Sequence, residues 1–122
     1  YQPGKMVKAT KKEKEDAQKW VDEKVKASGS TNIHDALEQA FNIVSASSDA
    51  KNLKKGADTI YFMTDGQPTD GRFLDPELIL REVKRWNQTR KITIHAIGVG
   101  RFAAAGFLQR LAAENGGQYI DR

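Results

Sequence analysis

Two oxygen-bearing side chains stand at abrupt changes in the sequence pattern, and both could bind a hard metal ion. Thr31 comes just before a segment with helical periodicity, and Asp65 follows an apolar run at residues 59–63, separated from it by Thr64 alone. A hydroxyl and a carboxylate are the oxygen ligands that Mg²⁺ takes in proteins. Each residue also has a commoner interpretation, because Thr31 or Asn32 would cap the helix and Asp65 would stabilise a turn.

The apolar run before Asp65 predicts a strand. Residues 59–63 are β-favouring and apolar at successive positions, which is typical of a strand buried on both faces of a parallel sheet. In such sheets, ligands bind beyond the carboxyl ends of the strands. This interpretation places Asp65 where a metal ion or another ligand would lie.

Four segments carry apolar residues at helical spacing. Thr10 and Glu13 form a capping box that opens the first helix, whose apolar stripe we expect to be buried. Asp75 followed by Pro76 opens the third helix, and Gly116 ends the fourth. The predicted stripes are Ala17, Trp20, Val21 and Val25; Ile33, Ala36, Leu37, Ala40, Phe41 and Val44; Ile79, Val83 and Trp86; and Phe107, Leu108, Leu111 and Ala112.

Strands alternate with the last three helices, and residues 91–99 and 118–120 form the further predicted strands. This order predicts an α/β fold with three layers, in which helices cover both faces of a doubly wound, mostly parallel sheet. Residues 45–56 are polar and predict a loop. Three strands make a small sheet, and residues 59–63 have the pattern of a central strand. We therefore expect residues 1–122 to form a single, incomplete domain, an internal piece of a larger one.

Composition excludes several classes of function. The 122-residue chain has a formal net charge of +4 and a sequence pI of about 9.4. Its lysines at residues 5–14 alternate with acidic residues and lack aromatic neighbours, which favours a solvated helix face over a nucleic-acid site. The absence of cysteine excludes disulfides and thiolate metal sites. No apolar run approaches the ~18 residues of a membrane span, so we expect no membrane insertion.

Several segments, in order along the chain, resemble the von Willebrand factor A domain family. They are Gly-Ser-Thr-Asn-Ile at 29–33, Phe-Met-Thr-Asp-Gly-Gln-Pro-Thr at 62–69, Ile-His-Ala-Ile-Gly-Val-Gly at 94–100, Phe-Leu-Gln-Arg-Leu-Ala at 107–112 and Asn-Gly-Gly-Gln-Tyr at 115–119. The resemblance implies a Rossmann-like, doubly wound α/β domain that serves in protein interaction or adhesion and is not an enzyme.

Many members of this family bind a divalent ion at a metal-ion-dependent adhesion site built from three loops. An acidic residue of the partner protein completes the coordination. The resemblance assigns Thr31 to the threonine ligand and Asp65 to the aspartate of the last loop. It implies Mg²⁺ or Mn²⁺ as the cofactor of the intact domain.

The sequence departs from the family at the first metal motif. No Asp-x-Ser-x-Ser segment precedes residue 29, and no helix follows the last predicted strand. Two protein ligands bind Mg²⁺ poorly, so we expect weak or no metal binding by this chain alone. Without the family's first strand, the strand at 59–63 would have an unpaired edge. Because exposed edges recruit other chains, we also expect self-association.

A glycine pattern supports an alternative function. Residues 98–103 fit the dinucleotide fingerprint G-x-G-x-x-[G/A], and Asp121 lies about 20 residues further on, where a ribose-binding acid is expected. The chain would then be a nucleotide-binding fragment of an α/β enzyme that uses Gly98 and Gly100. The commoner interpretation is that these glycines permit a tight turn between strand and helix.

Four other polar residues fit structural roles better than chemical ones. No partner for His34 or His95 is evident in the sequence, and His95 is more typical of packing than of catalysis. Asp70 could add negative charge near Asp65, but it fits a turn. Asp75 fits a helix cap.

Overall fold

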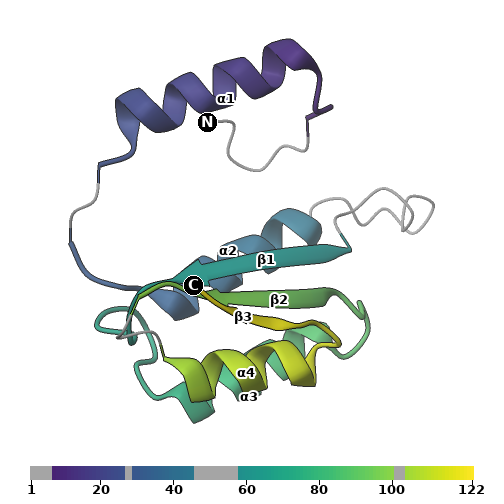
Figure 1. The fold of residues 1–122 in the computed structure, drawn as a ribbon. Coiled ribbons are helices and arrows are strands. Elements are labelled where there is room, and N and C mark those ends of the chain that lie inside the picture. The colour runs from purple at the N-terminus through teal and green to yellow at the C-terminus, as the bar shows by residue number, and fades with distance from the viewer. Residues whose placement is uncertain (1–6, 27–28, 46–57, 101–103) are drawn as a thin grey trace.

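The computed structural model describes residues 7–26, 29–45, 58–100 and 104–122. The predicted loop, apart from Ser45, lies outside these residues, as do Arg101, Phe102 and Ala103 of the glycine pattern. The described elements, in chain order, are α1 (Lys11–Lys24), α2 (Ile33–Ser45), β1 (Thr59–Thr64), α3 (Pro76–Asn87), β2 (Thr93–Gly98), α4 (Ala105–Glu114) and β3 (Tyr119–Asp121) (Figure 1).

The three strands form one parallel sheet in the order β1-β2-β3. Thr59 pairs with Thr93 at the start of the β1–β2 ladder, and Ala96 pairs with Tyr119 at the start of the β2–β3 ladder. The predicted α/β class with a parallel sheet is therefore confirmed. Because the strands are parallel, the loops that follow β1 and β2 leave from the same end of the sheet.

Helices α2, α3 and α4 share a single hydrophobic core with one face of the sheet. The strands contribute every second residue to this core, with Ile94 and Ala96 fully buried and Ile60 and Phe62 partly buried. The predicted stripes supply nearly all of the buried helix residues: Ile33, Leu37, Phe41, Ile79, Val83, Phe107, Leu108, Leu111 and Ala112. Leu80 is buried although no stripe included it, while Ala36 is exposed and Ala40 and Trp86 are half-buried.

The opposite face of the sheet is open in the described part of the chain. Tyr61 and Met63 of β1 have relative exposures of 72% and 64%, although both are apolar for most of their length. The expectation of helices on both faces is therefore met on one face only. The two crossovers, β1-α3-β2 and β2-α4-β3, move in the same direction along the sheet, so right-handed connections place α3 and α4 on the same face. The pleat turns Tyr61 and Met63 towards the other face.

Helix α1 contributes nothing to either face, so the expected burial of its stripe was wrong. None of its residues is buried, and Trp20, Val21 and Val25 are exposed. In Figure 1, α1 lies apart from the sheet on the side of β1. None of the described helices is long and apolar enough to cross a membrane.

The predicted helix boundaries are confirmed by their caps. The Thr10 hydroxyl accepts from the backbone N–H of Glu13, and the Asp75 carboxylate accepts from that of Glu77. At the end of α4, Gly116 has a φ of +69°, and Gly117 donates to the carbonyl of Ala112. This is the Schellman arrangement that stops a helix and turns the chain towards the next strand.

At Gly117 the turn after α4 approaches the sheet so closely that we expect no larger residue to fit there. An added Cβ would lie 1.9 Å from the carbonyl oxygen of Ile94, which is backbone and cannot rotate away. We expect Gly117→Ala to lower the free energy of unfolding by about 3 kcal/mol, at the upper end of overpacking effects. Chemical denaturation followed by circular dichroism measures this change.

Gly106→Ala is the matched control, because an added Cβ there meets no atom within 4 Å. Gly106 lies in the first turn of α4, where alanine is the better helix former, so we expect a gain of about 0.5–1 kcal/mol. Equal destabilisation by both substitutions would contradict the role assigned to Gly117.

Candidate functional site

The loop before α2 and the loop after β1 are joined by hydrogen bonds to the backbone of Thr31. The N–H of Thr31 donates to the hydroxyl oxygen of Thr69 over 2.8 Å. The carbonyl of Thr31 accepts from the N–H groups of Thr69 and Asp70, at 2.9 and 3.2 Å. Residues that are 38 positions apart in the sequence are therefore held together at the carboxyl end of the sheet.

A close approach of Asn32 to Gly71 tightens the same junction. Gly71 has a φ of +106°, and an added Cβ would lie 2.2 Å from Oδ1 of Asn32. That oxygen accepts from the N–H of Asp35, and the amide nitrogen of Asn32 donates to the Asp35 carboxylate over 2.7 Å. Of the two predicted cap candidates, Asn32 is the one whose side chain caps α2. Its fixed position requires a glycine at residue 71.

Thr31 and Asp65 lie on the two loops that this junction joins. A Cβ added to Gly66 would lie 3.9 Å from the hydroxyl oxygen of Thr31, so this hydroxyl faces the start of the β1 loop. The hydroxyl of Thr64 bonds to both backbone groups of Gly66 at 3.3 Å, which fixes the turn around Asp65. Asp65 is exposed, and no other described residue hydrogen-bonds its carboxylate.

The donor set at this junction fits a hard divalent cation in part. Thr31 and Asp65 offer oxygen ligands, which Mg²⁺ and Mn²⁺ prefer. Asp70 is already engaged, because it accepts from the hydroxyl of Ser30 over 2.6 Å and from the N–H of Gly71 over 2.7 Å. The described residues thus leave two ligands available where octahedral coordination needs six, some of them water.

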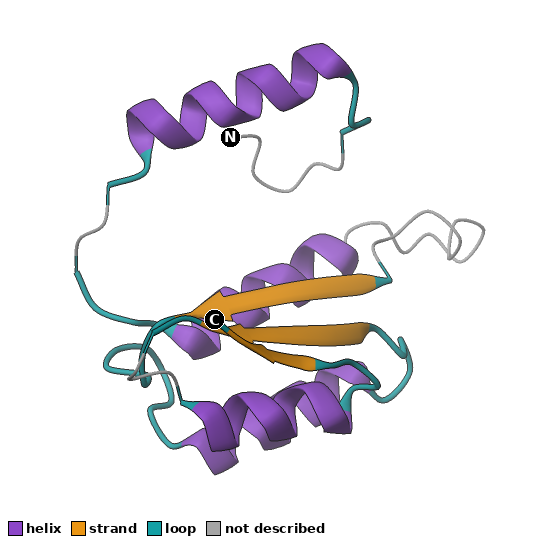
Figure 2. Ribbon diagram, in the orientation of Figure 1, coloured by secondary structure: helices purple, strands orange, loops and turns teal. Residues whose placement is uncertain are grey.

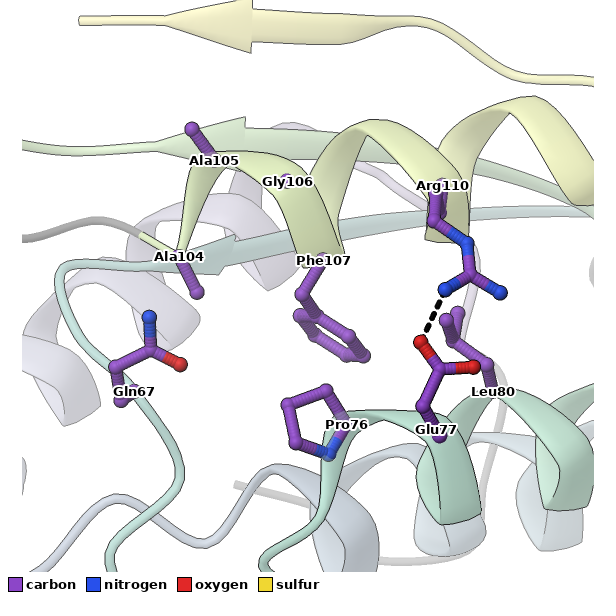
Figure 3. A pocket seen from close by; sticks show the side chains of 9 residues that line it. All are labelled: Gln67, Pro76, Glu77, Leu80, Ala104, Ala105, Gly106, Phe107 and Arg110. Carbon is purple, nitrogen blue, oxygen red and sulfur yellow. Dashed lines mark hydrogen bonds and ion pairs between the residues drawn. The ribbon is translucent and has the colours of Figure 1, made fainter.

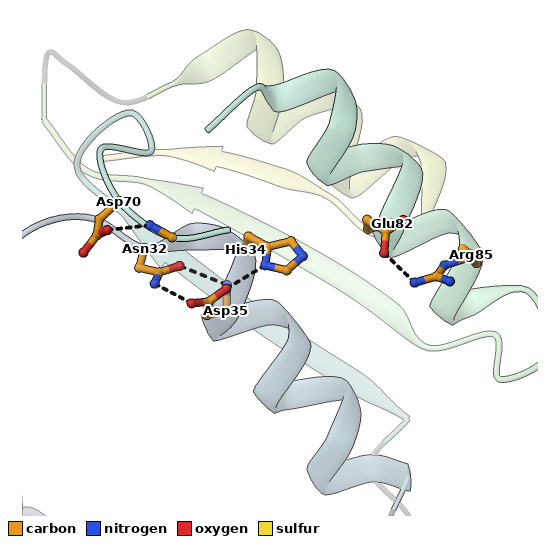
Figure 4. A network of polar contacts seen from close by, with 7 residues as sticks. Asn32, His34, Asp35, Asp70, Glu82 and Arg85 are labelled. Carbon is orange, nitrogen blue, oxygen red and sulfur yellow. Dashed lines mark hydrogen bonds and ion pairs between the residues drawn. The ribbon is translucent and has the colours of Figure 1, made fainter. Parts of the chain in front are cut away.

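A second polar group lies beside the junction, at the first turn of α2 (Figure 4). His34 is fully buried, and its Nδ1 lies 2.7 Å from Oδ1 of Asp35. Its ring packs edge-on against Phe73, with the ring centroids 4.9 Å apart. No partner for His34 was expected from the sequence, although Asp35, the next residue, was the available signal.

This group stabilises the start of α2 and is not a free metal site. Potential ligand atoms of His34, Asp35 and Glu38 lie within 4.8 Å of one another. The Asp35 carboxylate already accepts from His34 and Asn32, and these bonds hold the pKa of Asp35 below its ordinary value. A metal ion would have to break both bonds, one of them to a buried ring.

Gly98 and Gly100, the glycines of the dinucleotide pattern, take part in pairing between the end of β2 and the end of β3. Gly100 has a φ of +80°, and its N–H donates to the carbonyl of Arg122 over 2.8 Å. The N–H of Arg122 donates in turn to the carbonyl of Gly98, and Asp121 pairs with Gly98 in the ladder. The tight-turn interpretation accounts for these contacts. The Gly100 N–H, which a phosphate would need, is already bonded within the protein.

His95 has a packing role, as its position in a strand suggested. Its ring stacks on that of Tyr61 on the open face, with the centroids 5.0 Å apart and an interplanar angle of 15°. Its Nδ1 lies 3.2 Å from the backbone N–H of Gln118 and accepts from it. His95 thus links β1 and β2 to the segment that leads into β3.

A hollow of about 340 Å³ lies between the β1 loop and the amino ends of α3 and α4 (Figure 3). Its charged wall is the ion pair of Arg110 with Glu77, and Glu114 also contacts Arg110. These two carboxylates raise the pKa of Arg110 above its ordinary range. Neither Thr31 nor Asp65 lines the hollow, so it is separate from the loop junction.

The bond between Ser30 and Asp70 generates a prediction about pH. The Ser30 hydroxyl, followed by the N–H of Gly71, holds the pKa of Asp70 below its ordinary value of 3.8. The bond therefore favours the folded loop at pH values above 3.8 and is lost as the pH falls through the lowered pKa. We expect Ser30→Ala to raise the pKa of Asp70 towards 3.8, measured by NMR titration of the carboxyl carbon. If the titration midpoint of Asp70 stayed the same in the Ser30→Ala variant, the hydrogen bond between Ser30 and Asp70 would be refuted.

Comparison with known proteins agrees with this architecture. The model of the von Willebrand factor type A domain family matches residues 2–121. Inter-alpha-trypsin inhibitor heavy chain H2 of Mesocricetus auratus is 35% identical over 113 residues, which are 92% of this chain and 12% of the relative. The human H2 chain is 34% identical over 116 residues, with the same coverage of both chains.

Heavy chain H4 of Homo sapiens is 33% identical over 94 residues, which are 76% of this chain and 10% of the relative. The chain thus spans about an eighth or less of the length of these curated relatives. The family match covers nearly every residue, and the parallel sheet with its helices has the corresponding α/β architecture. The chain belongs to the von Willebrand factor type A domain family.

Proposed function

We propose that this chain is part of a protein-interaction module and that its site uses a divalent cation, Mg²⁺ or Mn²⁺. The cation would bind at the carboxyl end of the sheet and capture an acidic side chain of a partner protein. The hydrogen-bonded junction of the two loops supports this proposal best, because it holds the Thr31 hydroxyl beside the turn that carries Asp65.

Each residue of the junction has a distinct role in the proposed site. The Thr31 hydroxyl would be a neutral ligand, fixed because its own backbone is bonded on both sides to Thr69. The Asp65 carboxylate would bind the cation directly or through water. Asp70 would position the loop through Ser30 and remain outside the metal's coordination. The bound cation supplies the positive charge that a carboxylate from the partner requires.

The proposed site needs more ligands than the described residues offer at the junction. Thr31 and Asp65 give two, and Mg²⁺ binds firmly only with near-octahedral oxygen coordination. The missing Asp-x-Ser-x-Ser segment would supply them if it pairs beside β1, next to Asp65. In the 122-residue chain alone we propose a scaffold with weak metal affinity.

A binding role fits the observations better than catalysis. The junction offers a hydroxyl and a carboxylate with no general base beside them among the described residues, since Asp70 and Asp35 are both engaged. The nearby His34 is buried and bonded to Asp35. We therefore propose that the chain is not an enzyme.

Metal titration tests the proposed site. With the 122-residue chain, we expect paramagnetic broadening by Mn²⁺ not to saturate below about 1 mM, the weak end of protein sites for hard cations. A longer chain that adds the Asp-x-Ser-x-Ser segment should bind at least about tenfold more tightly, because it adds ligands. The amide signals that broaden first should be those of Thr31, Asp65 and Gly66.

Two substitutions in the longer chain locate the ion, and one serves as the control. Thr31→Val, which removes one ligand, and Asp65→Asn, which replaces a charged carboxylate ligand with a neutral amide, should each weaken Mn²⁺ binding about tenfold. Asp58→Asn should leave it unchanged, since Asp58 is an exposed carboxylate at the other end of β1. Equal effects of Asp58→Asn and Asp65→Asn would indicate general electrostatics and refute the assigned site.

Calorimetry with NAD tests the nucleotide alternative. We expect no binding heat, because the N–H of Gly100 is bonded to Arg122 and the turn is closed against β3. A saturable heat that Gly100→Val abolishes would establish the alternative instead.

A further inference from the structure

The Asp35 carboxylate joins the first turn of α2 to the loop that follows β1. Its Oδ2 accepts from the side-chain amide of Asn32, and its Oδ1 lies 2.7 Å from Nδ1 of His34 (Figure 4). The backbone N–H of Arg72, in the loop after β1, adds a third bond. These bonds, that from His34 first, hold the pKa of Asp35 below its ordinary value. Donors from both segments therefore meet on one side chain.

His34 anchors this carboxylate in the hydrophobic core. Its ring is fully buried and packs against Phe73 of the loop after β1 and Trp86 of α3, with ring centroids 4.9 and 5.5 Å away. Because an ionised carboxylate can only accept, Nδ1 carries the proton of the bond to Asp35. The other ring nitrogen, Nε2, is buried without a hydrogen-bond partner. The polar contact that orients His34 in the described chain is thus its bond to Asp35.

Asp35 also fixes Asn32, the residue that follows the candidate ligand Thr31. The Asn32 side chain accepts from the backbone N–H of Asp35 and donates to its carboxylate, so both ends of the amide are bonded to one residue. The same amide lies against Gly71, where an added Cβ would come within 2.2 Å of its oxygen. The path of the backbone from Thr31 into α2 therefore depends on the Asp35 carboxylate.

Two layers of contacts hold the loop before α2 beside the loop after β1, at the arrowhead of β1 (Figure 2). The outer layer is exposed, and in it Thr31 bonds to Thr69 and Asp70. The inner layer is the group around Asp35, which is anchored to the buried ring of His34. Local opening is easiest where hydrogen bonds are exposed and buried contacts are few. The inner layer is therefore the part that keeps the outer bonds closed.

We propose that Asp35 is a positioning residue of the loop junction, which holds the loop after β1 against α2 and so fixes the Thr31 hydroxyl without binding the metal ion. As far as the metal ion is concerned, this inference rests on the proposed function. The Asp35 carboxylate is occupied by donors from the protein. Groups that orient metal ligands from outside the coordination shell are bonded in this way.

Amide hydrogen exchange tests this role in the 122-residue chain, with no metal present. Asp35→Asn keeps the shape of the side chain but leaves one acceptor oxygen in place of two. The N–H groups of Thr69 and Asp70, which bond to the carbonyl of Thr31, should then exchange about tenfold faster. The N–H of Ala96, bonded to Gln118 within the sheet, should exchange at an unchanged rate. A loss of global stability would instead accelerate exchange at Ala96 as well.

Glu38→Gln is the matched control for charge. Glu38 lies one turn further along α2, and its carboxylate is within 4.8 Å of ligand atoms of His34 and Asp35. Among the described residues nothing hydrogen-bonds this carboxylate, so the substitution removes the same negative charge and breaks no bond. We expect it to leave exchange at Thr69 and Asp70 unchanged.

Asn32→Ser is a second variant that keeps the fold of α2. Serine caps a helix about as well as asparagine, but it cannot donate to the Asp35 carboxylate as the amide does. Exchange at Thr69 and Asp70 should therefore be faster in this variant too. Circular dichroism of each variant confirms that the helices remain formed.

Mn²⁺ titration of the longer chain connects this role to the metal site. Asp35→Asn should weaken binding about tenfold, as expected for a group that orients a ligand. Glu38→Gln should have a much smaller effect, because it alters the charge near the site but not the position of Thr31.

Two results would overturn the proposal. Unchanged exchange at Thr69 and Asp70 in the Asp35→Asn variant would show that the carboxylate does not hold the loops, whether or not a cation binds. Equal effects of Asp35→Asn and Glu38→Gln would indicate charge alone. If the unsubstituted longer chain binds no Mn²⁺, the proposed function fails, and faster exchange in Asp35→Asn still supports the role of Asp35 in joining the two loops.

Discussion

The site depends on one set of hydrogen bonds, those that join Thr31 to Thr69 and Asp70. Each such bond contributes a net stability of only about 0.5–1.5 kcal/mol, but together they fix the relative position of two loops. The parallel sheet makes this junction possible, because it brings the end of β1 beside the start of α2. The caps at Asn32 and Asp75 and the close contact at Gly71 then hold both loops against a rigid base.

The hydrophobic core that supports this junction lies on one face of the sheet in the described part of the chain. Helices α2, α3 and α4 bury one face of the sheet, while Tyr61 and Met63 lie exposed on the other. A small sheet with one covered face leaves much apolar area in water, and a chain of this length buries a smaller fraction of its surface than a large domain. Tyr61, Met63 and the stripe of α1 are exposed for the same reason, because no described helix packs against them.

The sequence predicted those features that depend on neighbouring residues. Helix caps, the strand at 59–63 and the turn at Gly116 follow from local conformational preferences, and the structure has them. The burial of the α1 stripe was predicted wrongly because burial requires a partner surface, and Trp20 meets none in the described chain. The pairing of Ser30 with Asp70 spans 40 residues, so no local pattern could reveal it. Likewise, the adjacency of His34 and Asp35 in the sequence did not show that the histidine would be buried.

The proposed metal site depends on β1 as well as on the loop junction. The carbonyls of Asp58 and Thr64 bond towards β2, so Thr59, Tyr61 and Met63 turn their N–H and C=O groups to the other side of the strand. A further parallel strand that paired there would end at the same edge of the sheet as β1, and the residues after it would lie next to Asp65. Such a strand would complete the sheet and supply metal ligands together, so the cation would stabilise the strand pairing by mass action.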